Sequence, residues 1–432
     1  MRICVLGLSH LGSVTAACLA RLGHEVVGLD FDAAAIARLS RAVAPALEPG
    51  LEDLLRDGLA SGRLRFTTAL EEAVGEAELL WVAYDTATSD GCGLEPQEVL
   101  ANAARVLGAC AAGVTVLLSS QLPPGSVREL EQAAAAGGTC RADIACCPEN
   151  LRLGRAVADF LHAERFVVGI RAGAPRERIE RLLSSVGARI EWMSVESAEV
   201  TKHALNAYLA TSVVFANEVA ALCESLGADA KEVERGLRSD SRIGTGAYLA
   251  PGAAFAGGTL ARGLEQLTAA AHARRVDTPL LTAALRSNEQ HRYWARQRLQ
   301  ALFPDLASRR VAIWGLSYKP GTDSLRGSLA VQLCEWLLAA HATVRVHDPA
   351  AGALPVHWQG RVDRCADPLA AVAGADALVI ATPWPAYREF SAAQLRAASP
   401  HLAVLDADRV LPRLGSEPAL RYLSVGLGGR AP

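Results

Sequence analysis

The fold of the N-terminal part of the chain is decided by the stretch MRICVLGLSHLGSVTAACLARLGHEVVGLD, residues 1–30. The apolar run at residues 2–8 predicts a buried parallel strand, and Gly7 near its end opens a turn. Residues 12–22 have helical periodicity, and residues 24–30 form a second apolar run that ends in an acid. Strand, glycine turn, helix, strand and acid in this order are typical of the dinucleotide-binding unit of an open α/β fold.

The glycine turn predicts an NAD site. Gly7 and Gly12 allow a tight turn in which backbone N–H groups and the helix N-terminus face a pyrophosphate. Asp30 would accept a hydrogen bond from the ribose 2′-hydroxyl, which favours NAD over NADP. The middle glycine of the G-x-G-x-x-G pattern is Ser9 here, and its Cβ crowds the phosphates, so a nucleotide fold with an altered or empty site is the alternative. The expected cofactor contacts in this turn are Gly7, Ser9, Leu11, Gly12 and Asp30.

Apolar runs that predict further buried strands follow at residues 78–83, 114–119, 143–147 and 165–170. Ligands of open α/β sheets bind at the carboxyl ends of such strands. Polar side chains stand at these ends, among them Glu149, and we expect Thr86 and Ser120 to contact the cofactor.

A long helix is predicted over residues 197–226, where Lys202 and Asn206 share one face because they are four residues apart. A solvated polar face is the alternative interpretation of this pair. The segment at residues 248–260 is rich in glycine and small residues, which predicts either a loop that a ligand can approach closely or a plain connector.

A second unit that begins with a strand follows Pro304. It contains the predicted strands 310–316, 343–348 and 377–381 and the predicted helix 329–340. It lacks a dinucleotide fingerprint, so we expect it to bind something other than a second NAD. The predicted fold class is therefore α/β, with two Rossmann-like doubly wound domains joined by a long central helix and a helical middle domain. The expected domains are residues 1–195, 196–300 and 301–432.

Composition excludes several classes of function. The 432 residues carry 43 basic and 46 acidic side chains, a net charge of −3 that gives no electrostatic reason to expect nucleic acid or an anionic membrane as a partner. No uncharged run reaches the roughly 18 apolar residues of a membrane span.

The ten cysteines show no CxxC pair and no metal-ligand spacing, which predicts reduced thiols, a cytoplasmic location and no metal site. Residues 1–20 could also pass for a signal peptide, but the strand–turn–helix pattern favours the first strand and helix of the fold.

Taken together, the motifs resemble the UDP-glucose/GDP-mannose dehydrogenase family over essentially the whole chain. The matching segments, in order, are residues 7–12 with Asp30, 48–51 (EPGL), 62–68 (GRLRFTT), 148–152 (PENLR), 198–206, 248–260, 318–326 and 422–426. The resemblance implies an NAD-dependent oxidoreductase that acts on the primary alcohol of a UDP- or GDP-linked sugar and forms a homodimer. In the family, a cysteine thiolate traps the aldehyde, a second hydride transfer gives a thioester, and water cleaves it.

The resemblance also implies roles for particular residues. Lys202, Asn206, Glu149 and Thr259 are the expected catalytic residues, with Lys202 and Asn206 at the sugar's reacting centre, where they stabilise developing oxyanion charge. Thr259 stands at the position of the nucleophile. Further expected contacts are Lys319 and Arg326 for the cofactor and Leu151, Arg152, Tyr248, Phe255, Gly257 and Gly258 for the substrate.

The chain departs from the family pattern in the loop that carries the nucleophile. The family's F-G-G-S-C-L-P-K-D reads FAGGTLARG here, so Thr259 replaces the cysteine, Arg262 the lysine and Gly263 the aspartate. The family's second glutamate falls on Leu153. A threonine hydroxyl is a poor nucleophile without a strong base nearby, and Cys147 is a possible substitute because it directly precedes the PEN motif.

Three hypotheses follow for the function. The first is a single two-electron oxidation, or a redox-neutral hydride transfer, on a nucleotide sugar. The second is a full four-electron 6-dehydrogenase that uses another nucleophile. The third is a non-catalytic homologue that still binds the nucleotide or nucleotide sugar.

Overall fold

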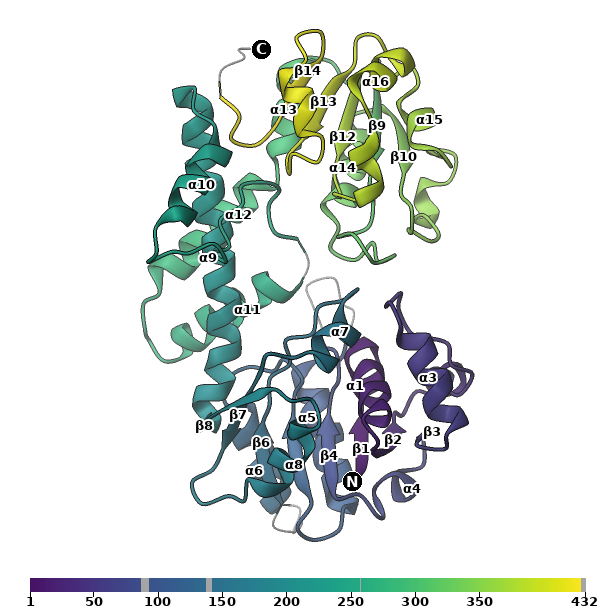
Figure 1. Ribbon diagram of the computed structural model, residues 1–432, viewed down its shortest axis with the longest axis vertical. Coiled ribbons are helices and arrows are strands. Elements are labelled where there is room, and N and C mark those ends of the chain that lie inside the picture. Colours follow the sequence, from purple (N-terminus) through teal and green to yellow (C-terminus); the bar gives the residue numbers. More distant parts are fainter. Residues whose placement is uncertain (87–92, 137–141, 257, 429–432) are drawn as a thin grey trace. The chain divides into compact units, whose positions relative to one another are not determined.

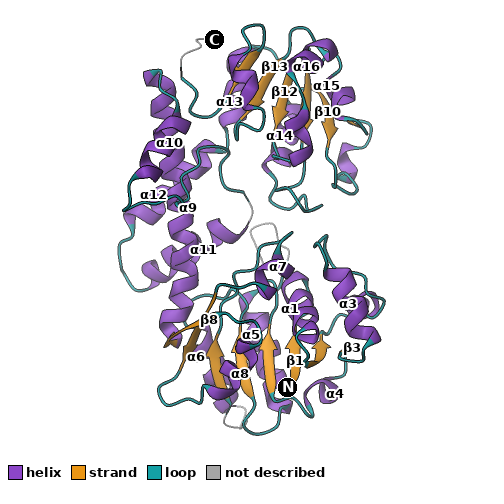
Figure 2. Ribbon diagram, in the orientation of Figure 1, coloured by secondary structure: helices purple, strands orange, loops and turns teal. Residues whose placement is uncertain are grey.

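The computed structural model describes residues 1–86, 93–136, 142–256 and 258–428. The chain forms two compact units, Met1–Leu205 and Asn206–Pro432, which are described separately below. In each unit, helices flank a sheet that consists mainly of parallel strands (Figure 1, Figure 2). The predicted α/β class with two Rossmann-like sheets and a long helix is therefore confirmed.

The first unit contains an eight-stranded sheet in the order β3-β2-β1-β4-β5-β6-β7-β8. The order runs outward from β1 in both directions, as in a doubly wound fold. All neighbouring strands are parallel except β6 and β7, which pair antiparallel through Cys146 and Gly169. The strands are β1 (Arg2–Leu6), β2 (Glu25–Leu29), β3 (Leu64–Thr67), β4 (Leu79–Val82), β5 (Thr115–Leu118), β6 (Asp143–Cys146), β7 (Arg165–Ile170) and β8 (Arg189–Ser194).

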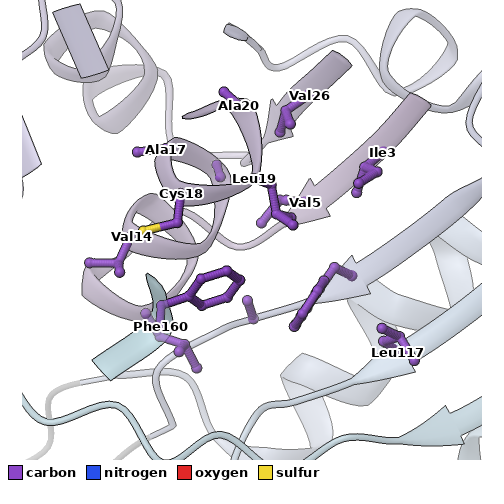
Figure 3. Close-up of a cluster of buried hydrophobic side chains, with 14 of the residues drawn as sticks. Ile3, Val5, Val14, Ala17, Cys18, Leu19, Ala20, Val26, Leu117 and Phe160 are labelled. Atoms are coloured by element: carbon purple, nitrogen blue, oxygen red, sulfur yellow. The ribbon is translucent and has the colours of Figure 1, made fainter. Parts of the chain in front are cut away.

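Both faces of this sheet are buried under helices, because successive side chains of a strand point to opposite faces. Ile3 and Val5 of β1 pack against Val14 and Cys18 of the first helix, with Phe160 in the same cluster (Figure 3). The opposite face carries a second cluster under α5 and α6. The helices are α1 (His10–Arg21), α2 (Ala33–Leu39), α3 (Leu51–Ala60), α4 (Leu70–Val74), α5 (Pro96–Ala109), α6 (Ser126–Ala136), α7 (Ala156–Leu161) and α8 (Glu177–Ser184), followed by α9 (Val195–Leu226), which begins in this unit and continues into the second from Asn206.

The second unit begins with helices and continues with a six-stranded parallel sheet in the order β11-β10-β9-β12-β13-β14. Its strands are β9 (Arg310–Trp314), β10 (Thr343–His347), β11 (Val362–Arg364), β12 (Ala377–Ile380), β13 (Ala403–Asp406) and β14 (Arg421–Leu423). Besides the later part of α9, its α-helices are α10 (Ala230–Ser239), α11 (Gly258–Ala273), α12 (Pro279–His291), α13 (Trp294–Leu302), α14 (Leu329–Ala339), α15 (Pro368–Val372) and α16 (Ala392–Ala398). One prediction needs correction: residues 258–260, expected in a glycine-rich loop, form the first turn of α11.

Helix α9 is long and apolar enough to cross a membrane by length and composition. Of its most apolar window, 39% is buried within the structure. Core helices of globular proteins meet the same criteria, and in the second unit the side chain of Asn217 on α9 accepts a hydrogen bond from the N–H of Gly252.

The turn after β9 is held by one buried carboxylate. Asp348, which follows β10, accepts hydrogen bonds from the N–H groups of Leu316 and Ser317 at 2.7 and 2.8 Å and from those of Ala350 and Ala351 at 2.8 and 2.7 Å. Burial acts to raise the pKa of this carboxyl, but the backbone donors outweigh it and hold the pKa below its usual value.

We predict that Asp348→Asn lowers the free energy of unfolding by about 2–3 kcal/mol, because the backbone N–H groups would then face a neutral amide in place of a charged carboxylate. A carboxyl with a lowered folded pKa stabilises the fold above its unfolded pKa, and this contribution is lost as pH falls through the folded pKa. The difference from wild type should therefore be full at pH 7 and shrink below about pH 4. Urea denaturation followed by tryptophan fluorescence measures it. Asp363→Asn, at an exposed aspartate of the same unit, is the control and should change little; equal effects would contradict the assignment.

Candidate functional site

The loop between β1 and α1 has the geometry that a dinucleotide requires. Gly7 adopts a φ of +88°, which L side chains rarely adopt. A Cβ on Gly12 would lie 1.6 Å from the carbonyl oxygen of Gly7, so only glycine lets the helix start this close to the turn. The structure therefore explains both glycines of the fingerprint by close backbone approach.

Asp30 lies directly after β2 and is oriented by the backbone. One carboxylate oxygen accepts from the N–H of Leu8 at 2.7 Å, and the other accepts from the N–H of Asp32 at 3.0 Å. Each carboxylate oxygen has a second lone pair. Asp30 can therefore hold the turn and still accept a hydrogen bond from a ribose hydroxyl.

Two positions of the fingerprint, Ser9 and Leu11, contact Asp85, which lies three residues after β4. The Oγ of Ser9 accepts from the N–H of Asp85 at 3.1 Å. The N–H of Leu11, at the start of α1, donates to the Oδ2 of Asp85 at 3.4 Å. Sequence reasoning did not assign a role to Asp85, although its position at the carboxyl end of a strand was a usable signal.

The expected cofactor residues Thr86 and Ser120 lie at the ends of β4 and β5, and both are buried. Thr86 donates from its hydroxyl to the carbonyl oxygen of Gln121 at 3.0 Å, which ties the two strand ends together. A small pocket begins here and is lined in part by Ser120, Gln121, Pro148, Glu199, Lys202 and His203. The structure therefore places Ser120 and the expected catalytic lysine around one pocket within the first unit.

Lys202 projects from α9 into this pocket and pairs with the PEN motif. Its ammonium lies 3.7 Å from a carboxylate oxygen of Glu149 and donates to the Oδ1 of Asn150 at 3.4 Å. Only 7% of the Lys202 side chain and 17% of the Glu149 side chain is exposed, so the pair acts across a medium of reduced dielectric. The other oxygen of Glu149 accepts from the N–H of Leu151 at 2.6 Å, which fixes the carboxylate. Lysine and glutamate expected to be catalytic are thus in contact.

Glu199, one turn before Lys202, ties α9 to the segment after β5. Its carboxylate accepts from the N–H groups of Gly125 and Val127 at 2.8 and 2.9 Å. Burial raises the pKa of Glu199 above its usual value in spite of these two donors. This contact fixes the start of α9, and with it the direction of the Lys202 side chain.

Cys147 does not meet the requirements of a substitute nucleophile. Its side chain is buried, and burial raises the pKa of its thiol to about 12, with an opposing hydrogen bond from Ser119. The thiolate is the nucleophilic form, so almost none of it is present at neutral pH. The structure thus argues against this hypothesis.

In the second unit, the segment that would carry the nucleophile packs on α9 through Gly263. A Cβ on Gly263 would lie 2.5 Å from the Cβ of Asn206, so α11 touches α9 at the second expected catalytic position. Asn206 is buried, and its Nδ2 has no hydrogen-bond partner among the described residues. Thr259 stands in the first turn of α11 with its side chain exposed.

The expected substrate residues lie in varied surroundings. In the first unit, Leu151 is half-buried, whereas Arg152 is exposed and forms two hydrogen bonds through its guanidinium to Asp159, at 2.9 and 2.7 Å. In the second unit, Tyr248 is exposed. The side-chain amide of Asn288 accepts a hydrogen bond from the N–H of Phe255 and donates one to its carbonyl oxygen. Gly258 is the first residue of α11, and Gly257 lies outside the described residues.

The two remaining cofactor candidates, Lys319 and Arg326, belong to the second unit. Both lie half-buried in the segment between β9 and α14, at the carboxyl end of β9. The ammonium of Lys319 lies 5.4 Å from the ring centroid of Tyr318. Their assignment to the cofactor stays a prediction.

Glu48 is a residue of this region that sequence reasoning left without a role. Its buried carboxylate contacts the Nε2 of His10 at 2.8 Å and accepts from the N–H groups of Gly154 and Ala156 at 2.7 and 2.8 Å. It therefore links the start of α1 to the segment after the PEN motif. The EPGL motif was noted, but its glutamate meets His10 38 positions away and the two backbone donors more than 100 positions away in sequence.

Comparison with known proteins agrees with this geometry. Models of the UDP-glucose/GDP-mannose dehydrogenase family match residues 1–186 (NAD binding domain), 196–290 (central domain) and 312–413 (UDP binding domain). The chain belongs to this family. The expected family, oxidoreductase class, fold and NAD cofactor are thereby confirmed.

Individual relatives cover nearly the whole chain. A UDP-glucose 6-dehydrogenase of Pseudomonas aeruginosa is 35% identical over 90% of this chain and 89% of its own length. A GDP-mannose 6-dehydrogenase of Azotobacter vinelandii is 32% identical over 81% of each chain. The solved structure of a UDP-glucose dehydrogenase from Pyrobaculum islandicum superposes with a TM-score of 0.88 at 30% identity, covering 99% of this chain and 98% of the other.

We predict that Gly263→Ala destabilises the protein by about 1–3 kcal/mol, because the new Cβ pushes α11 away from Asn206. Gly236→Ala is the matched control: Gly236 lies in α10, and nothing lies within 4 Å of its added Cβ. The control should gain up to about 1 kcal/mol from helix propensity. Thermal unfolding of the two variants measures the difference, and a stabilised Gly263→Ala protein would show that the two helices are not tightly packed here.

Proposed function

We propose that the protein is an NAD-dependent oxidoreductase that oxidises a nucleotide sugar by a single two-electron step, or transfers the hydride out and back without net oxidation. The observation that carries the proposal is the buried Lys202–Glu149 pair beside a pocket, combined with an exposed threonine at the nucleophile position. The Lys202–Glu149 pair serves hydride transfer. The threonine replaces the thiol that the second oxidation needs.

The substrate class follows from the family. The model that matches residues 312–413 describes a UDP binding domain, and the relatives include UDP-glucose and GDP-mannose 6-dehydrogenases. A UDP-linked sugar is therefore the first candidate, and a GDP-linked sugar is the second. The pocket residues would face the carbon that carries the alcohol.

Alcohol oxidation requires a hydride acceptor, which NAD supplies when bound, and a group that takes up the hydroxyl proton. Lys202 is the cation beside the reacting oxygen in this proposal, and it stabilises the negative charge that develops as the O–H bond breaks. As the hydroxyl proton moves to Lys202, the ammonium passes a proton to the Glu149 carboxylate, 3.7 Å away, so that Glu149 is the final proton acceptor. Asn150 accepts a hydrogen bond from the same ammonium and helps to orient it. Asn206 lies one turn further along α9 and offers an amide donor without a described partner.

The second oxidation needs a covalent adduct that can lose hydride. A thiolate forms this adduct readily, but a β-branched hydroxyl does not ionise near neutral pH and attacks an aldehyde poorly. Thr259 is exposed, and Gly263 contributes no carboxylate to handle water. The reaction therefore stops at the aldehyde, or the hydride returns to the sugar.

A non-catalytic binding homologue is the second candidate. One observation favours it: Asp85 lies at the helix N-terminus where the cofactor's pyrophosphate binds. A four-electron dehydrogenase is the third candidate, and the buried Cys147 thiol counts against it.

The stoichiometry of NADH formation separates the three candidates. We predict one NADH, or none with isotope exchange at the carbinol carbon, for each UDP-sugar or GDP-sugar converted. Absorbance at 340 nm with product analysis by mass spectrometry measures both. Two NADH and a carboxylate product would overturn the proposal, and tight sugar binding without any turnover or exchange would favour the non-catalytic homologue.

Variants of two lysines test the site itself. Lys202→Met should lower the rate of hydride transfer about a thousandfold, because loss of one charge-stabilising donor costs about 3–4 kcal/mol in the transition state. Lys231→Met is the matched control, since Lys231 lies on α10 and pairs with Glu234 at 3.0 Å. Thr259→Ala should leave the rate unchanged within a factor of two or three. Loss of activity in that variant would instead support the catalytic role that the family resemblance implies for Thr259.

We further propose that the protein forms a homodimer through α9, as the family resemblance implies. Tyr208, Phe215 and Leu222 follow at intervals of seven residues, so they lie on one side of the helix, and all three are exposed, by 68%, 49% and 61%. A stripe of large apolar side chains of this length is typical of an interface. The expected cytoplasmic location, and the absence of nucleic-acid and membrane partners, stay predictions from composition.

We predict that Phe215→Glu converts the dimer to a monomer, because each interface would then bury two carboxylates without partners. Sedimentation velocity at micromolar concentration gives the mass. Val356→Glu is the control, because Val356 is an exposed valine outside α9 and receives the same change of polarity. A wild-type monomer, or a Phe215→Glu dimer, would contradict the assignment.

A further inference from the structure

The start of α1 has an unusual electrostatic arrangement. Helix N-termini attract anions because their first N–H groups lack partners within the helix. The first turn of α1 contains no acid, and the hydroxyl of its N-cap residue, Ser9, makes no capping hydrogen bond to the helix. The carboxylate that reaches this N-terminus comes from outside the helix, from Asp85 at the end of β4.

Two contacts hold Asp85 in this place. Its N–H donates to the Oγ of Ser9 at 3.1 Å, and its Oδ2 accepts from the N–H of Leu11 at 3.4 Å. Ser9 stands where the fingerprint has its middle glycine. A glycine there would have no side-chain oxygen to accept the hydrogen bond from the N–H of Asp85. The two side chains form one arrangement.

This arrangement occupies the position that the cofactor needs. In a dinucleotide fold, the pyrophosphate takes the N–H groups at the start of the first helix, which here include that of Leu11. Asp85 satisfies this N–H with a carboxylate, which is an anion like the phosphate. Cofactor and carboxylate therefore compete for one donor, and they also repel each other at short range.

We propose that Asp85 acts as an internal competitor of the cofactor: it occupies the pyrophosphate position in the free protein and must leave before NAD binds. The proposal rests on the NAD site of the first unit and not on the reaction. Its consequence is that the protein binds NAD weakly, and that affinity depends on the charge at position 85.

The alternative is a structural role, in which Asp85 only stabilises the start of α1. In that case the loop geometry depends on the carboxylate, and its removal weakens cofactor binding. Competition and structural support thus predict changes of opposite sign.

Isothermal titration with NAD, ADP and adenosine tests the proposal on wild type and on three variants, Asp85→Asn, Asp85→Gly and the control Asp57→Asn. Asp57 is an exposed aspartate on α3, so its variant changes the net charge equally but away from the loop. We expect Asp85→Asn to lower the dissociation constants of NAD and ADP about tenfold at low salt, and Asp85→Gly to lower them at least as much. Adenosine, which has no phosphate, should bind the Asp85 variants and wild type equally.

Salt provides a second readout. The gain in NAD affinity of Asp85→Asn should shrink in 0.5 M salt, because screening weakens the repulsion that the variant removes. Ser9→Ala removes the acceptor for the N–H of Asp85 and should tighten NAD binding by a smaller factor, with no further gain when it is combined with Asp85→Gly. Circular dichroism confirms that each variant keeps its helices.

Unchanged or weaker NAD binding in both Asp85 variants would overturn the proposal, as would an equal gain for adenosine. NAD binding to Asp85→Gly but not to wild type would be its strongest support. Since binding is measured without a sugar substrate, failure of the proposed reaction leaves these comparisons unaffected, and failure here leaves the stoichiometry experiment unaffected.

Discussion

In both units, the turn after the first strand is held by a carboxylate at the end of the second strand. Asp30 accepts from the N–H of Leu8, and Asp348 accepts from the N–H of Leu316, both at 2.7 Å. In each case a glycine with positive φ precedes that leucine. This hydrogen bond fixes where the following helix starts relative to the sheet, and the ligand positions at the strand ends depend on it.

The departures from the family pattern affect one part of the expected chemistry and leave another part in place. Lys202 and Glu149, to which the proposed function assigns hydride transfer, are present and in contact. The side chains for covalent capture and hydrolysis are replaced by Thr259 and Gly263. At Gly263 the replacement also has a packing consequence, because α11 approaches Asn206 more closely than any side chain at that position would allow. Restoring an aspartate at position 263 would thus require the helices to move.

Local patterns predicted most of the first unit. Apolar runs and the glycine turn located β1, β2, β4, β5, β6 and β7 to within two residues, because buried strands have a strong and short-range signal. They missed β3, β8, β11 and β14, which are short or only partly buried. They also missed β13, an internal strand whose four residues are all buried. They also predicted a loop at residues 258–260, where packing against α9 favours a helix in spite of the glycines.

The sequence by itself determined the fold class, the family and the NAD cofactor, because fingerprints, periodicity and motif order depend on residues close together along the chain. Only the tertiary structure decided which side chains meet. It buried Cys147, paired Lys202 with Glu149 and brought Asp85 to the start of α1, 74 positions away from Leu11. Contacts of that range depend on how strands are ordered in the sheet, and electrostatics and burial act through space and not along the chain.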